Sequence, residues 1–334
     1  MCTRAPGSNI RRKVQVLGYP IGVRQQRAGL LKVTASFASV LRCRWAALAS
    51  CSIRTFSSSA DMGNQCCAGR DTAYKRRAQE SEYGDHLKNM LSFGAVADDV
   101  VRFDRAYDNG DIAEFVRLCN STCEIEKLED RMHPWAADPE TIGALAATQL
   151  AIFASREQEP HLKDEIREAG GIEVLVKLLA SKELDRRQSA VVALSFLSVD
   201  NNQNCIAMYN EGALPPLIQG MKSDIEGMRA ACAQTARNIY VLGPKQRRAF
   251  LKAGGIAQLV RFLDAPPNAK NLYTQLEAIY HLEDFIAEEG GDDVPEFVQA
   301  VKSAGAVQKL MKLRDHQDKD VADAAGLLLV RLAD

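Results

Sequence analysis

The chain has 334 residues, of which 46% are hydrophobic, 25% charged and 6% aromatic. This composition indicates a folded, mainly helical protein, and no apolar run approaches the roughly 18 residues that a transmembrane helix needs. The net charge of −1 conceals a division, because residues 1–60 carry ten basic and no acidic side chains, and the acidic residues all follow. An acidic body argues against nucleic acid as the main partner, and nine cysteines without a secreted spacing favour a reducing compartment.

Residues 1–61 form an N-terminal extension that is rich in Arg and Ser and that we expect to be disordered. It closes with Arg54-Thr55-Phe56-Ser57-Ser58-Ser59, which is typical of the processing site of a mitochondrial presequence. The alternative is an untranslated stretch upstream of a true start at Met62, where the composition changes. Composition favours the second interpretation, and both exclude the extension from the fold.

The segment that begins at Met62 has the pattern of a lipid-anchored N-terminus. If Met62 initiates the protein and is removed, Gly63 presents the free amine that N-myristoylation needs. Cys66 and Cys67 follow as candidate palmitoylation sites. Cys67 stands where the motif usually has Ser or Thr.

Membrane energetics favour this lipid-anchor interpretation. A single myristoyl chain binds a bilayer only marginally, at roughly 10⁴ M⁻¹, so stable anchoring needs a second signal. Palmitoyl groups would supply it, and Arg70, Lys75, Arg76 and Arg77 could each add about 1 kcal/mol on an anionic leaflet. The alternative is an internal Gly63 with two unmodified thiols. We expect a tether and a first helix over residues 62–109.

The body of the chain is an internal repeat. Its leading glycines are separated by 42, 42 and 51 residues, and a leucine follows each glycine after five residues. These glycines are Gly170, Gly212, Gly254 and Gly305. An apolar helix is expected about twenty residues further on in each unit, at Ser189–Val199, Met228–Tyr240, Leu276–Ile286 and Val321–Leu332.

Each unit needs its neighbours to be stable. Glycine takes a positive φ freely, so it separates a short first helix from a second helix whose apolar stripe one unit cannot bury alone. Two further helices, Asp111–Cys119 and Ala144–Ala154, indicate a degenerate earlier unit. We therefore expect about five stacked units over residues 110–334.

The three-helix unit of 42 residues, with Gly-Gly-Ile or Gly-Ala-Leu before the second helix, resembles the armadillo repeat. The resemblance implies an all-α, right-handed α-solenoid that acts as a non-enzymatic scaffold. With the Met-Gly-Asn-x-Cys-Cys start, the chain is similar to the armadillo-repeats-only family of apicomplexan rhoptries. That resemblance implies attachment to the cytosolic face of the rhoptry, its apical positioning, and binding of an unconventional myosin, an adenylate cyclase and a family-specific partner. The alternative is a soluble armadillo adaptor imported into mitochondria.

In armadillo folds the third helices line a concave groove, where many members use Asn and Trp to bind basic peptides. Counting 26 residues from each leading glycine, and 27 in the third unit, places Phe196, Asn238, His281 and Arg331 at the Asn position. The Trp position, four residues earlier, holds no Trp, which argues against nuclear-import peptides. We predict partner contacts at four polar residues, Gln234, Asn238, Glu277 and His281, and plain packing for Phe196, Ile152 and Leu327.

The 51-residue spacing predicts an insertion of eight residues around 288–293. It contains four acidic residues, Glu288, Glu289, Asp292 and Asp293. A solvated acidic loop is one interpretation, and a docking loop for a basic partner is the other.

Candidate catalytic and metal sites are absent from the sequence. The five histidines form no metal-binding spacing, and no nucleophile elbow, phosphate loop or dinucleotide fingerprint occurs. We therefore predict no enzymatic activity, no metal and no cofactor beyond covalent myristoyl and palmitoyl groups.

Overall fold

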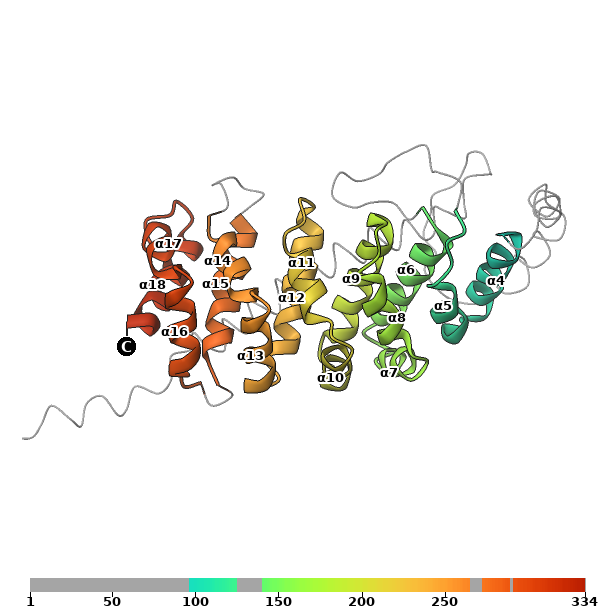
Figure 1. Cartoon of the computed structure of the whole chain (residues 1–334), viewed down its shortest axis with the longest axis horizontal. Helices are drawn as coiled ribbons and strands as arrows, with labels where there is room; N and C mark the ends of the chain where they lie inside the picture. The colour runs from blue at the N-terminus through green and yellow to red at the C-terminus, as the bar shows by residue number, and fades with distance from the viewer. Residues whose placement is uncertain (1–95, 125–139, 265–271, 289–290, 334) are drawn as a thin grey trace, which may run out of the picture. The chain divides into compact units, whose positions relative to one another are not determined.

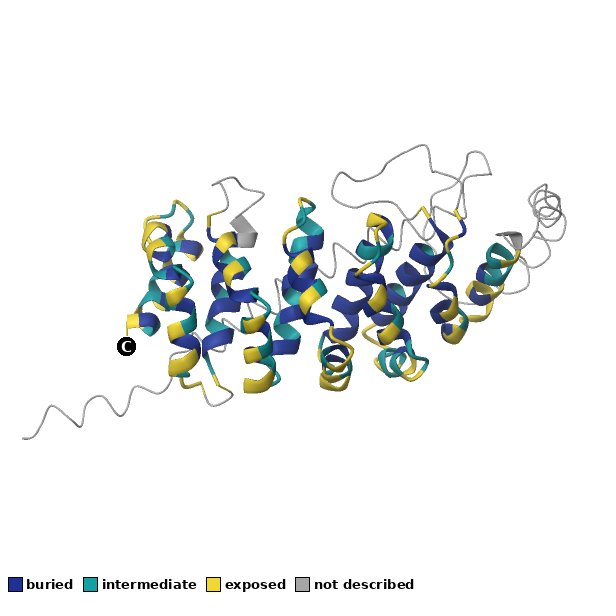
Figure 2. Ribbon diagram, in the orientation of Figure 1, coloured by how far each residue is buried: buried dark blue, intermediate teal, exposed yellow. Residues whose placement is uncertain are grey.

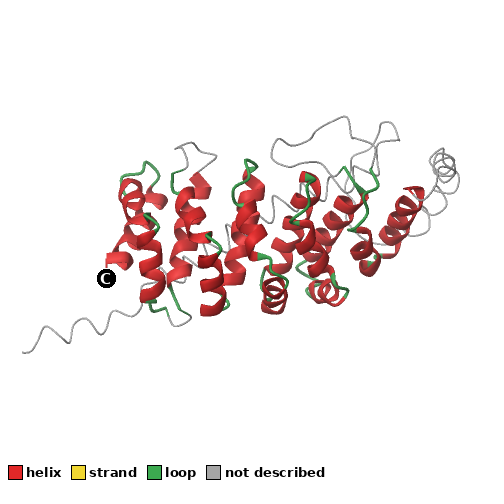
Figure 3. Ribbon diagram, viewed as in Figure 1, coloured by secondary structure: helices red, strands yellow, loops and turns green. Residues whose placement is uncertain are grey.

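The structure is a computed structural model that describes residues 96–124, 140–264, 272–288 and 291–333. Within these ranges every regular element is an α-helix, and short connections join the helices (Figure 3). Two isolated β-bridges, Glu124–Thr141 and Ala287–Asp293, are the β pairings described there. None of these helices has the length and apolar character that a membrane span requires. The chain divides into two compact units, and all described residues belong to the unit Ala49–Asp334.

The described helices form five groups of three in chain order (Figure 1). They are α4 (Val96–Asn109), α5 (Ile112–Leu118) and α6 (Ile142–Ala154); α7 (His161–Glu168), α8 (Gly171–Leu178) and α9 (Leu184–Ser198); α10 (Asn202–Asn210), α11 (Leu214–Gly220) and α12 (Glu226–Tyr240); α13 (Pro244–Lys252), α14 (Gly255–Phe262) and α15 (Leu272–Ile286); and α16 (Pro295–Ser303), α17 (Ala306–Leu313) and α18 (Lys319–Ala333). The expected all-α array of five units is confirmed.

A glycine with a positive φ separates the first and second helices in each of these five units. Gly170, Gly254 and Gly305 are the N-caps of α8, α14 and α17, with φ values of 81°, 83° and 83°. Gly212 and Gly110 have φ values of 76° and 66° at the same point of their units. Any residue with a Cβ is strained at such angles, which explains why the repeat is marked by glycine.

The third helices form the continuous core of the array. Contacts run from α6 to α9, then to α12, α15 and α18. Their inward side chains are fully buried, as at Leu150, Leu194, Ile239, Phe285 and Leu328. The first helices α7, α10, α13 and α16 carry much of the exposed surface (Figure 2).

The third helices begin two to five residues earlier than their apolar pattern predicted. α9, for example, begins at Leu184 rather than Ser189, and α12 begins at Glu226 rather than Met228. Their first turns contain Asp185 and Glu226, which interact favourably with the partial positive charge at a helix N-terminus. The apolar period therefore starts after the helix does.

Candidate functional site

The helices α9, α12, α15 and α18 are each 15 residues long, so their residues can be compared by position within the helix. Position 10 is buried in all four. Positions 9, 12 and 13 make up what we call the third-helix face. In chain order they hold Val192, Ser195 and Phe196; Gln234, Arg237 and Asn238; Tyr280, Glu283 and Asp284; and Leu327, Val330 and Arg331.

His281 is not part of this face. It occupies position 10, is only 2% exposed, and its Nε2 has no hydrogen-bond partner. Burial, together with the smaller effect of the Arg237 charge, lowers the pKa of the imidazole to about 3. His281 is therefore a core residue, and its predicted contact with a partner is wrong.

The error comes from the connection between α14 and α15. In three units the third helix begins 14 residues after the leading glycine. In the remaining unit α15 begins at Leu272, which is 18 residues after Gly254. Four extra residues lie there, so the Asn position falls on Asp284 and the Trp position on Tyr280. Glu277 instead lies half-buried at position 6. Aligning the buried ends of the helices, such as Tyr240 with Ile286, would have found this register.

Two of the predicted residues lie together in a polar network that crosses three units. The amide of Asn238 donates to the hydroxyl of Ser198 at 2.9 Å and accepts from Gln234 at 3.0 Å. Arg237 donates through Nε to Asp284 at 2.8 Å. Gln234, Arg237, Asn238 and Asp284 all remain half-buried. They can contact a partner without unfolding the array, although that contact stays a prediction.

The network has a second part at α15 and α18. Arg331 donates through Nε to both carboxylate oxygens of Asp293, at 3.1 and 3.2 Å. Burial raises the pKa of the neighbouring Glu283 to about 7. The charge of Arg331 opposes this rise, and the carboxylates of Asp284 and Asp293 add to it. This end of the third-helix face therefore concentrates acidic groups whose nearest cations are already paired.

The insertion that contains the acidic residues is shorter than predicted. Eight residues connect α15 to α16, whereas three connect α12 to α13, so five of the nine extra residues lie here. The remaining four lie between α14 and α15, and only the total was visible in the glycine spacing.

The described part of the insertion is folded back on the array. The amide of Glu288 donates to the carbonyl of Asp292, and the amide of Val294 donates to that of Ile286, both at 2.8 Å. Arg247 donates to the carbonyl of Ala287 at 2.7 Å. Asp293 is held by Arg331, whereas Glu288 and Asp292 are exposed. Glu289 lies outside the described residues, and docking of a basic partner here remains a prediction.

In the N-terminal half the same face is packed. Val192, Ser195 and Phe196 are 3%, 8% and 7% exposed. The α6 and α9 helices are joined by a hydrogen bond from Thr148 to Ser189 of 3.1 Å. Packing is therefore confirmed for Phe196, and Ile152 is half-buried. The prediction of plain packing is wrong for Leu327, which is 52% exposed.

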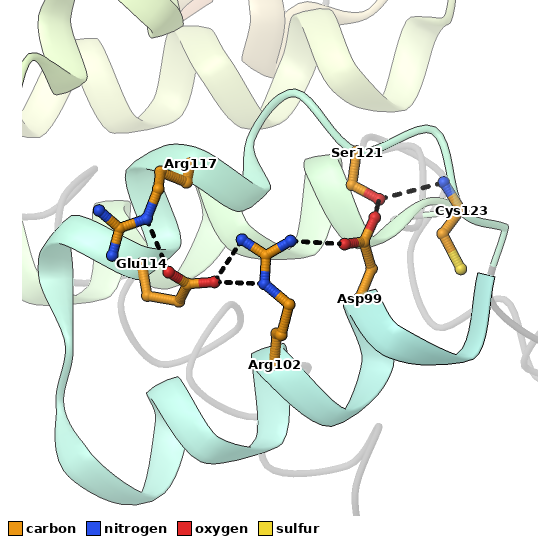
Figure 4. Close-up of polar contacts among 6 residues, drawn as sticks. All are labelled: Asp99, Arg102, Glu114, Arg117, Ser121 and Cys123. Atoms are coloured by element: carbon orange, nitrogen blue, oxygen red, sulfur yellow. Dashed lines mark hydrogen bonds and ion pairs between the residues drawn. The ribbon is translucent and has the colours of Figure 1, made fainter. Parts of the chain in front are cut away.

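A separate polar cluster joins α4 to α5 and to the connection after it (Figure 4). Arg102 bridges Glu114, at 2.7 Å, and Asp99, at 3.1 Å. Glu114 also binds Arg117, and Asp99 accepts from Ser121. Because these groups satisfy one another, the cluster holds the first unit together and offers little charge to a partner.

The predicted lipidation and membrane residues cannot be placed by the structure. Gly63, Cys66, Cys67, Arg70, Lys75, Arg76 and Arg77 all lie outside the described residues. The described cysteines, Cys119, Cys123, Cys205 and Cys232, are buried and are not joined in disulfides. Among the described residues no group of His, Cys, Asp and Glu could hold a metal ion.

Comparison with solved structures identifies similar arrays. The chain is 62% identical to ARO, the armadillo repeats only protein from Plasmodium falciparum, with a TM-score of 0.67 over 70% of this chain and 97% of that one. A designed armadillo repeat protein in complex with the peptide (KR)4 has a TM-score of 0.54 at 21% identity, over 78% of this chain and 95% of that chain. Another designed armadillo repeat protein has a TM-score of 0.52 at 23% identity, covering 69% and 85%. No protein-family model and no curated protein sequence matched the chain.

Proposed function

We propose, from the premise that the chain belongs to the armadillo-repeats-only family, that it tethers other proteins to an organelle membrane. As an armadillo-repeat protein it is a non-enzymatic, protein-binding scaffold. The proposal adds two elements to that role, a lipid anchor at Gly63, Cys66 and Cys67 and a partner surface on the third helices.

The partner surface is supported by the polar network of the third-helix face. An array that served only to pack its own units would bury this face, as α9 does at Phe196. In α12 and α15 the face instead carries half-buried Arg237, Asn238 and Asp284, which can exchange hydrogen bonds with an incoming chain. This contrast is the observation that carries the proposal.

The proposed organelle is the rhoptry. Its cytosolic face would be the attachment site, and the partners would be an unconventional myosin, an adenylate cyclase and a family-specific protein. The mechanism is physical linkage, with lipid chains holding one end of the protein in the bilayer and the solenoid holding a motor or a signalling enzyme. The resemblance to the family supports these roles, and the acylation motif at residues 62–67 supports the membrane attachment.

Membrane fractionation tests the anchor. Gly63→Ala should release most of the protein, because palmitoylation depends on prior contact with the bilayer. Cys66→Ser with Cys67→Ser should leave weak, salt-sensitive binding from one myristoyl chain and the basic cluster. Intact mass of the N-terminal peptide supplies the direct readout. If the Gly63→Ala variant stays in the membrane fraction, myristate is not the anchor.

A second candidate function is that of a soluble armadillo adaptor imported into mitochondria. Residues 1–60 carry ten basic and no acidic side chains, a feature of mitochondrial presequences, and this is the observation that supports it. An unacylated N-terminal peptide that starts between Ser57 and Met62 would support import and exclude the rhoptry proposal. Deletion of residues 1–61 should then abolish mitochondrial localisation.

A further inference from the structure

The last third helix carries apolar side chains at positions where the earlier helices do not expose them. Leu327 is 52% exposed and Val330 65% exposed, whereas their equivalents Val192 and Ser195 in α9 are buried. Residues three apart on a helix are neighbours, so Leu327 and Val330 form one apolar surface rather than two scattered contacts.

Acidic groups border this apolar surface. Asp320 and Asp323 lie seven and four residues before Leu327, on the same side of α18, and both are exposed. The α15 helix packs against α18. Burial raises the pKa of the Tyr280 hydroxyl on α15, and the charges of Glu283 and Asp320 add to the rise. We name these six residues the C-terminal patch: Tyr280 and Glu283 of α15, and Asp320, Asp323, Leu327 and Val330 of α18.

The nearby cations do not neutralise the patch. Arg331 is engaged by Asp293. Lys319, exposed on the first turn of α18, lies beside Asp320 and one turn before Asp323, so its single charge offsets one of these two carboxylates. The patch therefore combines an apolar end with a net negative end.

We propose that the C-terminal patch docks a basic amphipathic segment of another protein. Apolar side chains of that segment would cover Leu327 and Val330, and Lys or Arg side chains would pair with Asp320 and Asp323. Burying the carboxylates without cationic partners would be costly, so an acidic or uncharged segment is disfavoured. The inference rests on the proposed scaffold role but not on the lipid anchor.

Two other occupants fit the charge poorly. A second copy related by a two-fold axis would place the same carboxylates against each other, because such an interface uses one patch twice. An anionic membrane surface would repel them for the same reason. Charge complementarity therefore selects a basic protein partner.

The test uses a displayed library of random peptides of about 16 residues, roughly 24 Å of helix, selected against the full chain. Enriched peptides should be amphipathic with a net positive charge. Their affinity should fall at least about tenfold for Leu327→Ser with Val330→Ser, and less for Asp320→Asn with Asp323→Asn. Ile206→Ser on α10, where the side chain is 39% exposed, is the matched control and should leave the affinity unchanged.

Several outcomes would overturn the proposal. These are a library without binders, enrichment of acidic or uncharged peptides, and binding that survives the loss of Leu327 and Val330 in a protein with wild-type circular dichroism. A concentration-dependent dimer broken by the same double change would assign the patch to a second copy. If the basic tether of the same chain occupied the patch, changing Lys75, Arg76 and Arg77 to Gln would release it and raise the peptide affinity about tenfold. Such a gain would assign the patch to the tether. Failure of the Gly63→Ala fractionation test would leave this inference intact.

Discussion

The two halves of the third-helix face follow the same repeat but serve different purposes. In α9 the face is buried and mostly apolar, and α9 packs closely on α6, where Thr148 donates a hydrogen bond to Ser189. In α12, α15 and α18 the same positions hold charged, polar or exposed apolar side chains. One helical period therefore yields a face that is packed within the array in the N-terminal half and accessible in the C-terminal half, where we predict the partner contacts.

The largest expected contrast comes from one substitution made in each half. Leu194→Ala in α9 removes a fully buried side chain and should lower the free energy of unfolding by about 2–5 kcal/mol. Leu327→Ala in α18 should change it by less than about 0.5 kcal/mol, because that side chain is half exposed. Urea denaturation followed by circular dichroism measures both, and equal effects would remove the distinction between the halves.

Replacing one glycine by alanine in each half should change the stability of the protein in opposite directions. A Cβ at Gly143 in α6 would lie 2.4 Å from the carbonyl oxygen of Ser121, a backbone atom that cannot move aside cheaply. Gly143→Ala should therefore destabilise by about 1–3 kcal/mol. A Cβ at Gly326 in α18 meets nothing within 4 Å, so Gly326→Ala should stabilise by about 0.5–1 kcal/mol. Thermal unfolding measures both variants. If their melting temperatures shifted in the same direction, the difference in packing would be contradicted.

The pH dependence of stability should reveal the buried carboxyl of the C-terminal half. Glu283 keeps its proton up to a pH of about 7 when folded, against a pKa of 4.5 when unfolded. The folded state therefore binds more protons between these values, and this contribution to stability is lost as the pH rises through them.

Glu283→Gln should remove this loss. The stability of the variant relative to wild type should rise from pH 4.5 to pH 7.5. His281, whose pKa is lowered by burial, acts in the opposite direction near pH 6, but it is common to both proteins and cancels. A constant difference between the two proteins across this range would show that Glu283 titrates normally.

The smallest expected effect is that of the ion pair between units. Arg237 and Asp284 lie 2.8 Å apart, with side chains 26% and 31% exposed. A double-mutant cycle of Arg237→Ala and Asp284→Ala should give a coupling energy of about 1 kcal/mol or less, because solvent screens the pair. The same cycle on Arg248 and Glu296, which are more exposed, should give a value nearer zero. If the coupling energy of Arg248 and Glu296 were the larger of the two, the third-helix face would add nothing to the coupling between units.

The repeat itself could be predicted because its signals are local. The glycines at 170, 212, 254 and 305 require a positive φ, and the leucine five residues later follows from the helical period. Packing at Phe196 was also predictable, because an aromatic side chain on an apolar helix is most stable when buried. The exposure of Leu327 was not, because it depends on which helices pack against α18.

The amino-acid sequence by itself determined the helices, the breaks between them and the number of stacked units, since each depends on residues close together in the chain. It also placed the acylation motif at 62–67 and the acidic residues near 288–293. The tertiary structure alone decided the register of α15. The spacing of 51 residues gives a total, and only the packed helix ends divide it between two loops. That division buries His281 and places Asp284 on the third-helix face, where it pairs with Arg237. It thereby decides which side chains of the third helices can meet a partner.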